Sequence, residues 1–462
     1  MQEVNQFLSA IAAYTWWPVL FLIIGGGVFF LVYSGFVQYT YFSHALQILM
    51  GKFEDSKGPG QISPYKALST ALASTVGMGN LSGVAAAIAM GGPGALFWMW
   101  VTSFIGMSTN FFTSTLASMY RGKDSTGELQ GGPMYVIREA MSKHWQPMAT
   151  FFCLCCLVGM LPIFQANQLT QAIVDIGLKP AGIEEKMFMI GQSSFSVHKF
   201  VIGLLITVLV SVVIIGGIKR IGSWAGRLVP VMIVLHFISV AVILIVFSDQ
   251  LPYYIKLVFT DAFSATNYHG DPFLGGVLGG IIMLGVRRAT FSNEAGIGTA
   301  PMAMGASIST EPVREGLISM LSPVIDTLLS CSLTAFAILV TGVWQTEGIS
   351  GITLTSLAYR SAMPYGEYIL LLCTFVFAIS ALFSYSYYGR KALSYLIGEE
   401  RSQWYDYFYL SMIVVGAIVS MDLVLNLIDI AFALMAIPTM LSGFILAPKV
   451  KAEAKRYFAK LR

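Results

Sequence analysis

The sequence of 462 residues predicts an all-α integral membrane protein. Hydrophobic residues make up 56% of the chain, whereas Asp, Glu, Lys and Arg make up only 11%. Soluble domains carry about 25% charged residues, and a soluble surface with so few charges would expose very large apolar patches. The composition therefore excludes a soluble enzyme, a disordered protein and a nucleic-acid-binding protein. It indicates a lipid bilayer as the solvent.

Eleven stretches are long and apolar enough to cross a bilayer as helices, which takes about 20 mostly apolar residues each. They run over residues 14–36, 66–90, 94–118, 148–176, 198–216, 228–247, 275–305, 316–342, 367–396, 405–421 and 423–446. Strands of a membrane barrel would instead alternate over short segments. We therefore expect eleven transmembrane helices, the last two joined by a tight turn near Asp422.

The basic residues predict the orientation of these helices. If the eleven spans alternate in direction, twenty of the 27 Lys and Arg residues fall on one side of the membrane. These twenty include the Lys and Arg residues of the chain end at 448–462. Basic residues concentrate in cytoplasmic segments. We therefore expect the N-terminus outside and the C-terminus in the cytoplasm. The five cysteines lie in apolar runs and are expected to pack as small hydrophobes.

Most spans are smooth, but two are interrupted by glycine and small polar residues. The second contains Ser-Thr-Val-Gly-Met-Gly-Asn at 74–80, and the seventh contains Phe-Ser-Asn-Glu-Ala-Gly-Ile-Gly at 291–298. Such residues form helix poorly, and backbone freed at that depth must line a cavity or be buried. Without the first span, ten helices remain, and the interrupted ones head the two groups of five. This order is typical of secondary transporters with inverted repeats.

We therefore expect a ten-helix inverted five-plus-five repeat preceded by one extra N-terminal helix. The expected units are an N-terminal helix with its cytoplasmic loop (1–61), the first repeat (62–250), the second repeat (251–447) and a basic cytoplasmic tail (448–462).

The two interruptions predict a site for a zwitterion. Glycine spacings in membrane helices also serve close packing, but two interruptions that each contain an Asn and head a half favour binding. Half-helix N-termini suit a carboxylate, and half-helix C-termini and free carbonyls suit Na⁺ or an ammonium group. Scattered histidines and the absence of nucleotide-binding glycine motifs argue against an enzyme or a primary pump. A channel is the alternative, because broken helices also build ion filters.

Five ionisable residues within the spans are functional candidates, because charged groups are costly in a bilayer. Arg287 and Arg288 precede Glu294 in the seventh span, Asp326 lies in the eighth and Asp429 in the eleventh. One interpretation is that an arginine pairs with Glu294 or Asp326 and fixes the interrupted structure. The other is direct contact with a substrate. Asp429 is a candidate for helix packing or gating.

Several uncharged polar residues have two interpretations each. Gln165, in the fourth span, can bind a substrate or hold helices together. The hydroxyl of Ser380 can be a Na⁺ ligand or bond back to its own helix. Tyr387 and Tyr388 are interpreted as interfacial aromatics.

Residues 91–106, Gly-Gly-Pro-Gly-Ala-Leu-Phe-Trp-Met-Trp-Val-Thr-Ser-Phe-Ile-Gly, resemble the signature of the alanine or glycine:cation symporter family, the sodium:alanine symporters. Residues 77–80, 291–298, 312–316, 325–327 and 387–389 resemble further family blocks. The resemblance implies a leucine-transporter-like core and uptake of a small neutral amino acid such as alanine or glycine. It also implies Na⁺ as the coupling ion, no organic cofactor, no obligate protein partner and a prokaryotic plasma membrane.

The resemblance also implies roles for individual residues. The substrate would contact the backbone amides of 77–79 and a pocket formed by Thr75, Gly77, Met78, Gly79, Asn80, Gln165, Phe291, Ser292, Asn293, Ala381 and Tyr385. Na⁺ would lie near Ala73, Val76, Phe377 and Ser380. Independently of the resemblance, the position of Arg287, Glu294 and Asp326 within the spans predicts that they are structural or gating charges.

The chain departs from the family pattern at three pocket positions. Met78 stands where the family has Thr, Ala381 where it has a hydroxyl residue, and Tyr385 where it often has Trp. These departures leave open a larger neutral amino acid such as glutamine, H⁺ coupling and a non-transporting sensor.

Overall fold

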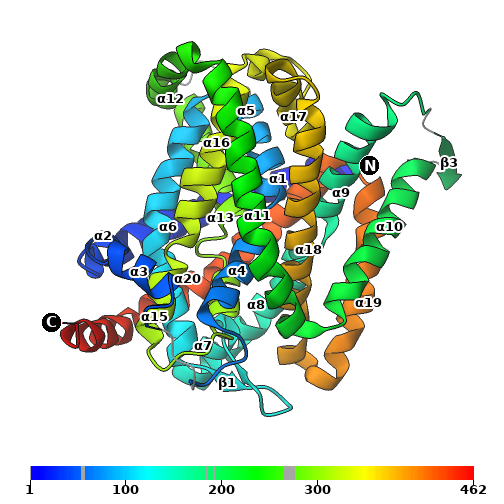
Figure 1. Ribbon diagram of the computed structural model, residues 1–462. Coiled ribbons are helices and arrows are strands. Elements are labelled where there is room, and N and C mark those ends of the chain that lie inside the picture. The colour runs from blue at the N-terminus through cyan, green and yellow to red at the C-terminus, as the bar shows by residue number, and fades with distance from the viewer. Residues whose placement is uncertain (1, 54–57, 184–185, 191–192, 265–275, 462) are drawn as a thin grey trace.

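The computed structural model describes residues 2–53, 58–183, 186–190, 193–264 and 276–461, and it is helical over most of them (Figure 1). Gly275, the first residue of the expected seventh span, lies outside the described residues. The α-helices are α1 Gln2–Tyr33, α2 Val37–Thr40, α3 Phe42–Leu49, α4 Pro64–Thr75, α5 Val84–Gly91, α6 Gly94–Met119, α7 Pro133–Ala140, α8 Gln146–Gly159, α9 Ile163–Ala172, α10 Val197–Ile214, α11 Gly217–Val246, α12 Leu251–Ser264, α13 Gly276–Asn293, α14 Thr299–Met304, α15 Pro312–Ser319, α16 Ser332–Val340, α17 Gly351–Ala362, α18 Gly366–Ile397, α19 Glu399–Ile418 and α20 Met421–Ala459.

The remaining elements are short. The π-helical turns are η1 Gly79–Gly83, η3 Ile173–Leu178 and η5 Val324–Cys331, and the 3₁₀ turns are η2 Lys143–Trp145, η4 Ser248–Gln250 and η6 Val343–Gln345. Two antiparallel hairpins pair β1 Gly122–Lys123 with β2 Leu129–Gln130 and β3 Met187–Ile190 with β4 Ser193–Ser196.

The chain crosses the membrane several times. In the described part of the chain, seven helical segments are long and apolar enough to span a bilayer, and α4 with η1 and α5, bent by 42° at its break, makes an eighth. The expected spans at 94–118, 275–305 and 405–421 form α6, α13 with α14, and α19, which fall outside this set. The multi-pass helical architecture is thus confirmed, and the count of eleven stays a prediction.

The two interrupted helices run antiparallel to each other. α4 begins at Pro64, where the side chain of Ser63 accepts a hydrogen bond from the backbone N–H of Lys66. A bridge between Ile62 and Ser307 places the start of α4 beside the end of α14. In the other half, η1 and α5 pack against α13. The breaks therefore meet at the same level, as an inverted repeat requires.

Two further spans are interrupted, so the expectation that only two would be broken was wrong. The fourth span stops between α8 and α9 at Met160–Pro162, and the eighth stops between α15 and η5 at Met320–Pro323. Both gaps end in a proline, which lacks the N–H that a continuous helix needs.

α20 continues through the expected boundary at residue 447 to Ala459, so most of the expected tail is the end of a membrane helix. The turn expected near Asp422 lies at Val419–Ser420. α1 packs along α20, and α2 and α3 lie on the same flank as the C-terminal end (Figure 1).

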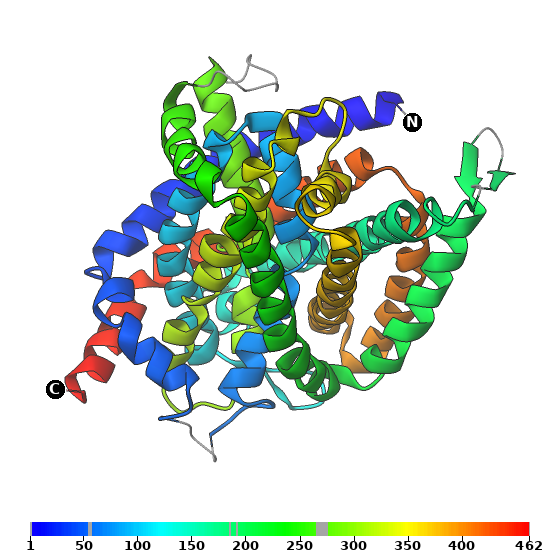
Figure 2. The ribbon, with the colours of Figure 1, turned by 45° about the horizontal axis from the view of Figure 1, so that its top comes forward.

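α18 lies inside the bundle between α11 and α19, and α10 covers α19 on the outside (Figure 2). The β1–β2 hairpin and α7 lie at one end of the molecule, and α12 and α17 lie at the other (Figure 1). All five cysteines are buried and free, as expected.

Candidate functional site

The first break exposes backbone that protein side chains partly satisfy. After α4 ends, the amide N of Gly77 donates to Oδ1 of Asn80 at 3.0 Å, and the amide N of Met78 donates to Oε1 of Gln165 at 3.2 Å. Both acceptors are buried. Two of the three amides expected to face a substrate carboxylate therefore have intramolecular partners, and Gln165 ties the fourth span to the break.

Glycine lets the second interrupted helix and α18 approach the first break closely. An ideal Cβ at Gly79 would lie 3.3 Å from Cα of Ser292 and 3.6 Å from Cδ1 of Phe291. A Cβ at Gly77 would lie 3.3 Å from Cβ of Ala381. The first break, the second interrupted helix and α18, which form three sides of the expected pocket, are thus in contact.

The second break places Glu294 at the centre of the bundle. Glu294 adopts the left-handed conformation with φ 53°, which is uncommon for a residue with a side chain. Its side chain is fully buried. Oε1 accepts a hydrogen bond from Oη of Tyr385 at 2.9 Å, and Oε2 accepts one from Oγ of Ser74 at 3.4 Å. Glu294 therefore joins α18 and the end of α4.

Asp326 joins the two interrupted helices on the other side. It is fully buried, and its Oδ1 accepts a hydrogen bond from Nδ2 of Asn80 at 2.7 Å. Its Oδ2 accepts hydrogen bonds from Oγ of Ser292 at 2.9 Å and Oγ1 of Thr327 at 2.8 Å. The carboxylate is therefore surrounded by hydroxyl and amide groups from three spans.

Neither buried carboxylate has a basic partner among the described residues. The expectation that Arg287 or Arg288 pairs with Glu294 or Asp326 was wrong. Both arginines contact the carboxylate of Asp429 on α20 instead. They precede the break by about two turns, and Arg287 also contacts Trp16 of α1. Their positive charges are therefore compensated by Asp429 and not by the carboxylates at the breaks.

The residues expected near Na⁺ are all buried. α4 carries Ala73 and is followed by Val76, and α18, which packs against α4, carries Phe377 and Ser380. Oγ of Ser380 donates to the carbonyl of Phe377 at 3.0 Å, which is the bond back to its own helix. A hydroxyl that donates its hydrogen keeps lone pairs that can bind a cation. In the described residues, no group of three or more His, Cys, Asp or Glu side chains could hold a metal.

The structure assigns two expected side chains to helix contacts. Nδ2 of Asn293 donates to Oγ1 of Thr327 at 3.0 Å, so this amide faces η5. Oγ1 of Thr75 lies 3.5 Å from the carbonyl of Leu72, within its own helix. The other members of the expected pocket are buried around the breaks.

Sequence reasoning misplaced one aromatic residue of this region. Tyr388 is fully buried, and its Oη lies 3.4 Å from Oγ of Ser74, so its interpretation as an interfacial aromatic was wrong. Tyr387 is also buried. Tyr388 follows Tyr385 by three residues, and this spacing places both on one face of a helix. This three-residue spacing was the sequence signal from which the burial of Tyr388 beside Tyr385 could have been predicted.

Comparisons with known proteins agree with this geometry. The sequence model of the sodium:alanine symporter family matches residues 1–462. The chain belongs to the sodium:alanine symporter family. It is 34% identical to the sodium/alanine symporter AgcS of Methanococcus maripaludis, over 98% of this chain and 97% of that protein. It is 32% identical to the probable sodium/glutamine symporter GlnT of Bacillus subtilis, over 99% of this chain and 91% of that protein.

A solved structure shows the fold of this sodium:alanine symporter family member. MhsT in complex with L-phenylalanine aligns with a TM-score of 0.59 and 12% identity, over 85% of this chain and 89% of that chain. This likeness shows a leucine-transporter-like fold. Together with the family, it confirms that the chain is a secondary amino-acid transporter of the membrane and not an enzyme.

Proposed function

We propose that the protein couples inward Na⁺ movement to the uptake of a small neutral amino acid such as alanine or glycine, by alternating access. The proposed setting is the plasma membrane of a prokaryote, with the N-terminus outside and the C-terminus in the cytoplasm.

The observation that carries this proposal is the pair of buried carboxylates without basic partners. An uncompensated buried charge costs several kcal/mol, and a bound cation removes that cost. Glu294 and Asp326 therefore call for two positive charges at the breaks. A Na⁺ ion and the ammonium group of an amino acid supply them, and each makes binding of the other more favourable. This mutual effect is the coupling that symport requires.

The carboxylate of the amino acid would lie near the amide of Gly79, where the π-helical turn η1 begins. The N-terminal end of this half-helix faces the break and carries the positive end of the helix dipole. The side chains of Met78, Phe291 and Tyr385 are buried around the breaks, and their bulk would restrict the substrate to a small side chain. Hard cations prefer oxygen ligands. We place Na⁺ at the carboxylate of Asp326, and Ser380 is a candidate hydroxyl ligand that the Ser380→Ala substitution tests.

Two other functions have specific support. Glu294 is a buried carboxylate that a proton could neutralise, and the putative sodium/proton-dependent alanine carrier YrbD of Bacillus subtilis is 33% identical over 86% of this chain. Glutamine is an alternative substrate because the chain is similar to GlnT.

Uptake into proteoliposomes tests the proposal. With Na⁺ outside and K⁺ inside, labelled alanine should accumulate above its external concentration, and excess unlabelled glycine should compete. Accumulation driven by a pH gradient alone would favour H⁺ coupling, and stronger competition by glutamine would change the substrate. Passive equilibration would indicate a channel, and saturable binding without uptake would indicate a sensor.

A further inference from the structure

A cavity of about 480 Å³ lies at the end of the molecule that carries the β1–β2 hairpin. Residues of α18, the start of α11, α19 and the hairpin line it. Its lining includes Ser386 and Tyr387, which stand between Tyr385 and Tyr388 on α18. The cavity therefore comes within one helical turn of the residues that contact Glu294 and Ser74. Its volume lies in the range of ligand pockets, roughly 300–1,000 Å³.

A buried cation lines this cavity. Lys391, near the end of the expected span at 367–396, is only 4% exposed. Its Nζ donates to the carbonyl of Met302 and to Oη of Tyr387, both at 2.9 Å. In the described part of the chain, Lys391 forms no ion pair. An ammonium group has three donors, so one remains for a ligand, and the buried charge favours an anionic one.

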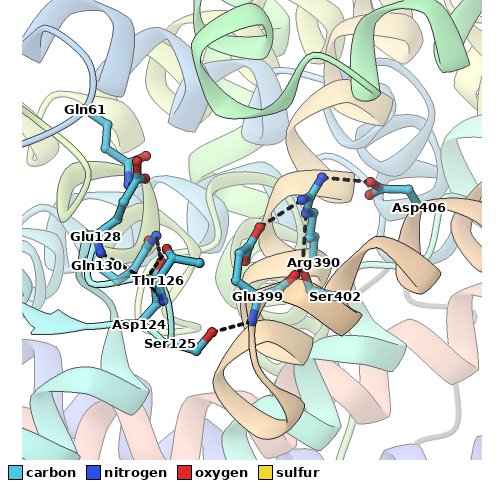
Figure 3. Close-up of polar contacts among 10 residues, drawn as sticks. All are labelled: Gln61, Asp124, Ser125, Thr126, Glu128, Gln130, Arg390, Glu399, Ser402 and Asp406. Carbon is cyan, nitrogen blue, oxygen red and sulfur yellow. Dashed lines mark hydrogen bonds and ion pairs between the residues drawn. The ribbon is translucent and has the colours of Figure 1, made fainter.

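A net negative cluster lines the same cavity. Arg390 donates to Oε1 of Glu399 at 2.8 Å and to Oδ2 of Asp406 at 2.9 Å (Figure 3). Two carboxylates share this one guanidinium, so the cluster carries an excess negative charge. Oδ1 of Asp406 is buried and has no hydrogen-bond partner among the described residues. This oxygen is free to accept a hydrogen bond from a ligand.

The hairpin carboxylates that also line the cavity are already bonded within the protein. Asp124 accepts hydrogen bonds from Thr126, from the amide of Glu128 and from Gln130, and Glu128 accepts one from Gln61 (Figure 3). Oγ of Ser125 accepts a hydrogen bond from the amide of Glu399 at 2.8 Å, which fixes the hairpin against the start of α19. The hairpin thus closes one side of the cavity.

We propose that this cavity is a second amino-acid site, which binds the substrate carboxylate at Lys391 and its ammonium group at Asp406. A buried cation and an anionic cluster on one cavity suit a zwitterion better than a simple anion or cation. A substrate that leaves the central site would meet this cavity next. The inference rests on the proposed function, because the zwitterion is the substrate named there.

The test measures each face of the transporter separately. Proteoliposomes are sorted for the orientation that puts the hairpin in the lumen, and efflux of preloaded labelled alanine is followed at increasing internal concentration. A hydrogen bond to a charged group contributes enough that Lys391→Met should raise the internal half-saturation about tenfold. The external half-saturation for uptake should stay within about twofold, since the site faces the lumen. Lys391→Arg, which keeps the charge, should restore most of the internal affinity.

Three comparisons make the outcome decisive. Asp406→Asn should also raise the internal half-saturation, and Lys123→Met, an exposed lysine of the hairpin, should not. If Lys391→Met changes internal and external half-saturation equally, or if Lys391→Arg fails to rescue, Lys391 only holds α14 and the second site is refuted. If Lys391→Met does not fold, unchanged internal half-saturation in Asp406→Asn refutes it. A wild-type protein that concentrates no amino acid would instead overturn the proposed function, and this inference with it.

Discussion

The substitution Asp326→Asn tests whether a cation compensates the buried carboxylate. Asparagine has nearly the same shape, and it can still accept a hydrogen bond from Asn80 with its one remaining oxygen. It removes the negative charge that three uncharged donors now surround. Without Na⁺, the variant should be as stable as the wild type or more stable, because no buried charge remains to be desolvated. With Na⁺, the wild type alone should gain stability.

The expected magnitude follows from the charge that the variant loses. Two unit charges 4 Å apart at an effective dielectric constant of 20 attract by about 4 kcal/mol. Each 1.4 kcal/mol is tenfold in affinity, so the cation should bind roughly 10³-fold more weakly. At a Na⁺ concentration 100 times the dissociation constant, the wild type gains about 2.7 kcal/mol of stability. The variant should gain roughly 0.1 kcal/mol at the same concentration.

Thermal unfolding in detergent, in NaCl and in choline chloride of equal ionic strength, measures this difference. The Na⁺-dependent rise in melting temperature should vanish in Asp326→Asn. Asp175→Asn is the matched control, because that carboxylate is already paired with Lys179, and it should keep the full rise. A Na⁺-dependent rise of wild-type size in Asp326→Asn would refute the charge argument.

Three further substitutions test the rest of the site. Gly79→Leu should abolish alanine uptake while the protein still folds, because any Cβ there meets Ser292; Gly177→Leu, with open space around it, is the control, and wild-type affinity in Gly79→Leu would remove the break from the site. Ser380→Ala should raise the Na⁺ concentration for half-maximal uptake, and an unchanged Na⁺ dependence would exclude its hydroxyl as a ligand. Asp429→Ala should destabilise the protein by roughly 3–5 kcal/mol, since the buried guanidinium of Arg288 and the partly buried one of Arg287 lose their partner. Unfolding in denaturant measures this, and a change below about 1 kcal/mol would show that water compensates them.

The sequence was sufficient for the features that depend on local composition. Long apolar runs predict the helices, and the glycines of 77–79 and 296–298 predict the two interruptions, because both are properties of short segments. Family resemblance also places Gln165 and Tyr385 at the breaks, where the structure has them. Pro162 and Pro323 stand at the two extra interruptions, but Pro18, Pro230 and Pro438 lie inside continuous helices, so proline alone does not predict where a span is interrupted.

The pairing of charges could not be predicted, because it depends on which faces of distant helices meet. Arg288 and Glu294 are six residues apart, and a continuous helix would bring them to within about two turns of each other. The left-handed turn at Glu294 changes the direction of the chain at that point. Asp429, the actual partner of Arg288, lies 141 residues away in sequence. No local pattern connects these two positions.

This separation of charges has a functional consequence. If Arg288 paired with Glu294, the negative charge at the break would be neutralised, and a cation would gain little free energy by binding there. Asp429 instead holds both arginines, so the two carboxylates at the breaks remain uncompensated within the described structure. A bound cation or a proton relieves the cost of burying them, and this makes an empty, ionised site less stable than a filled one. A transporter needs that difference, because binding must favour one arrangement of the two halves over another. The charges of these spans are therefore separated into two groups: Arg287, Arg288 and Asp429 join α13 to α20, and we propose that Glu294 and Asp326 select the ligands.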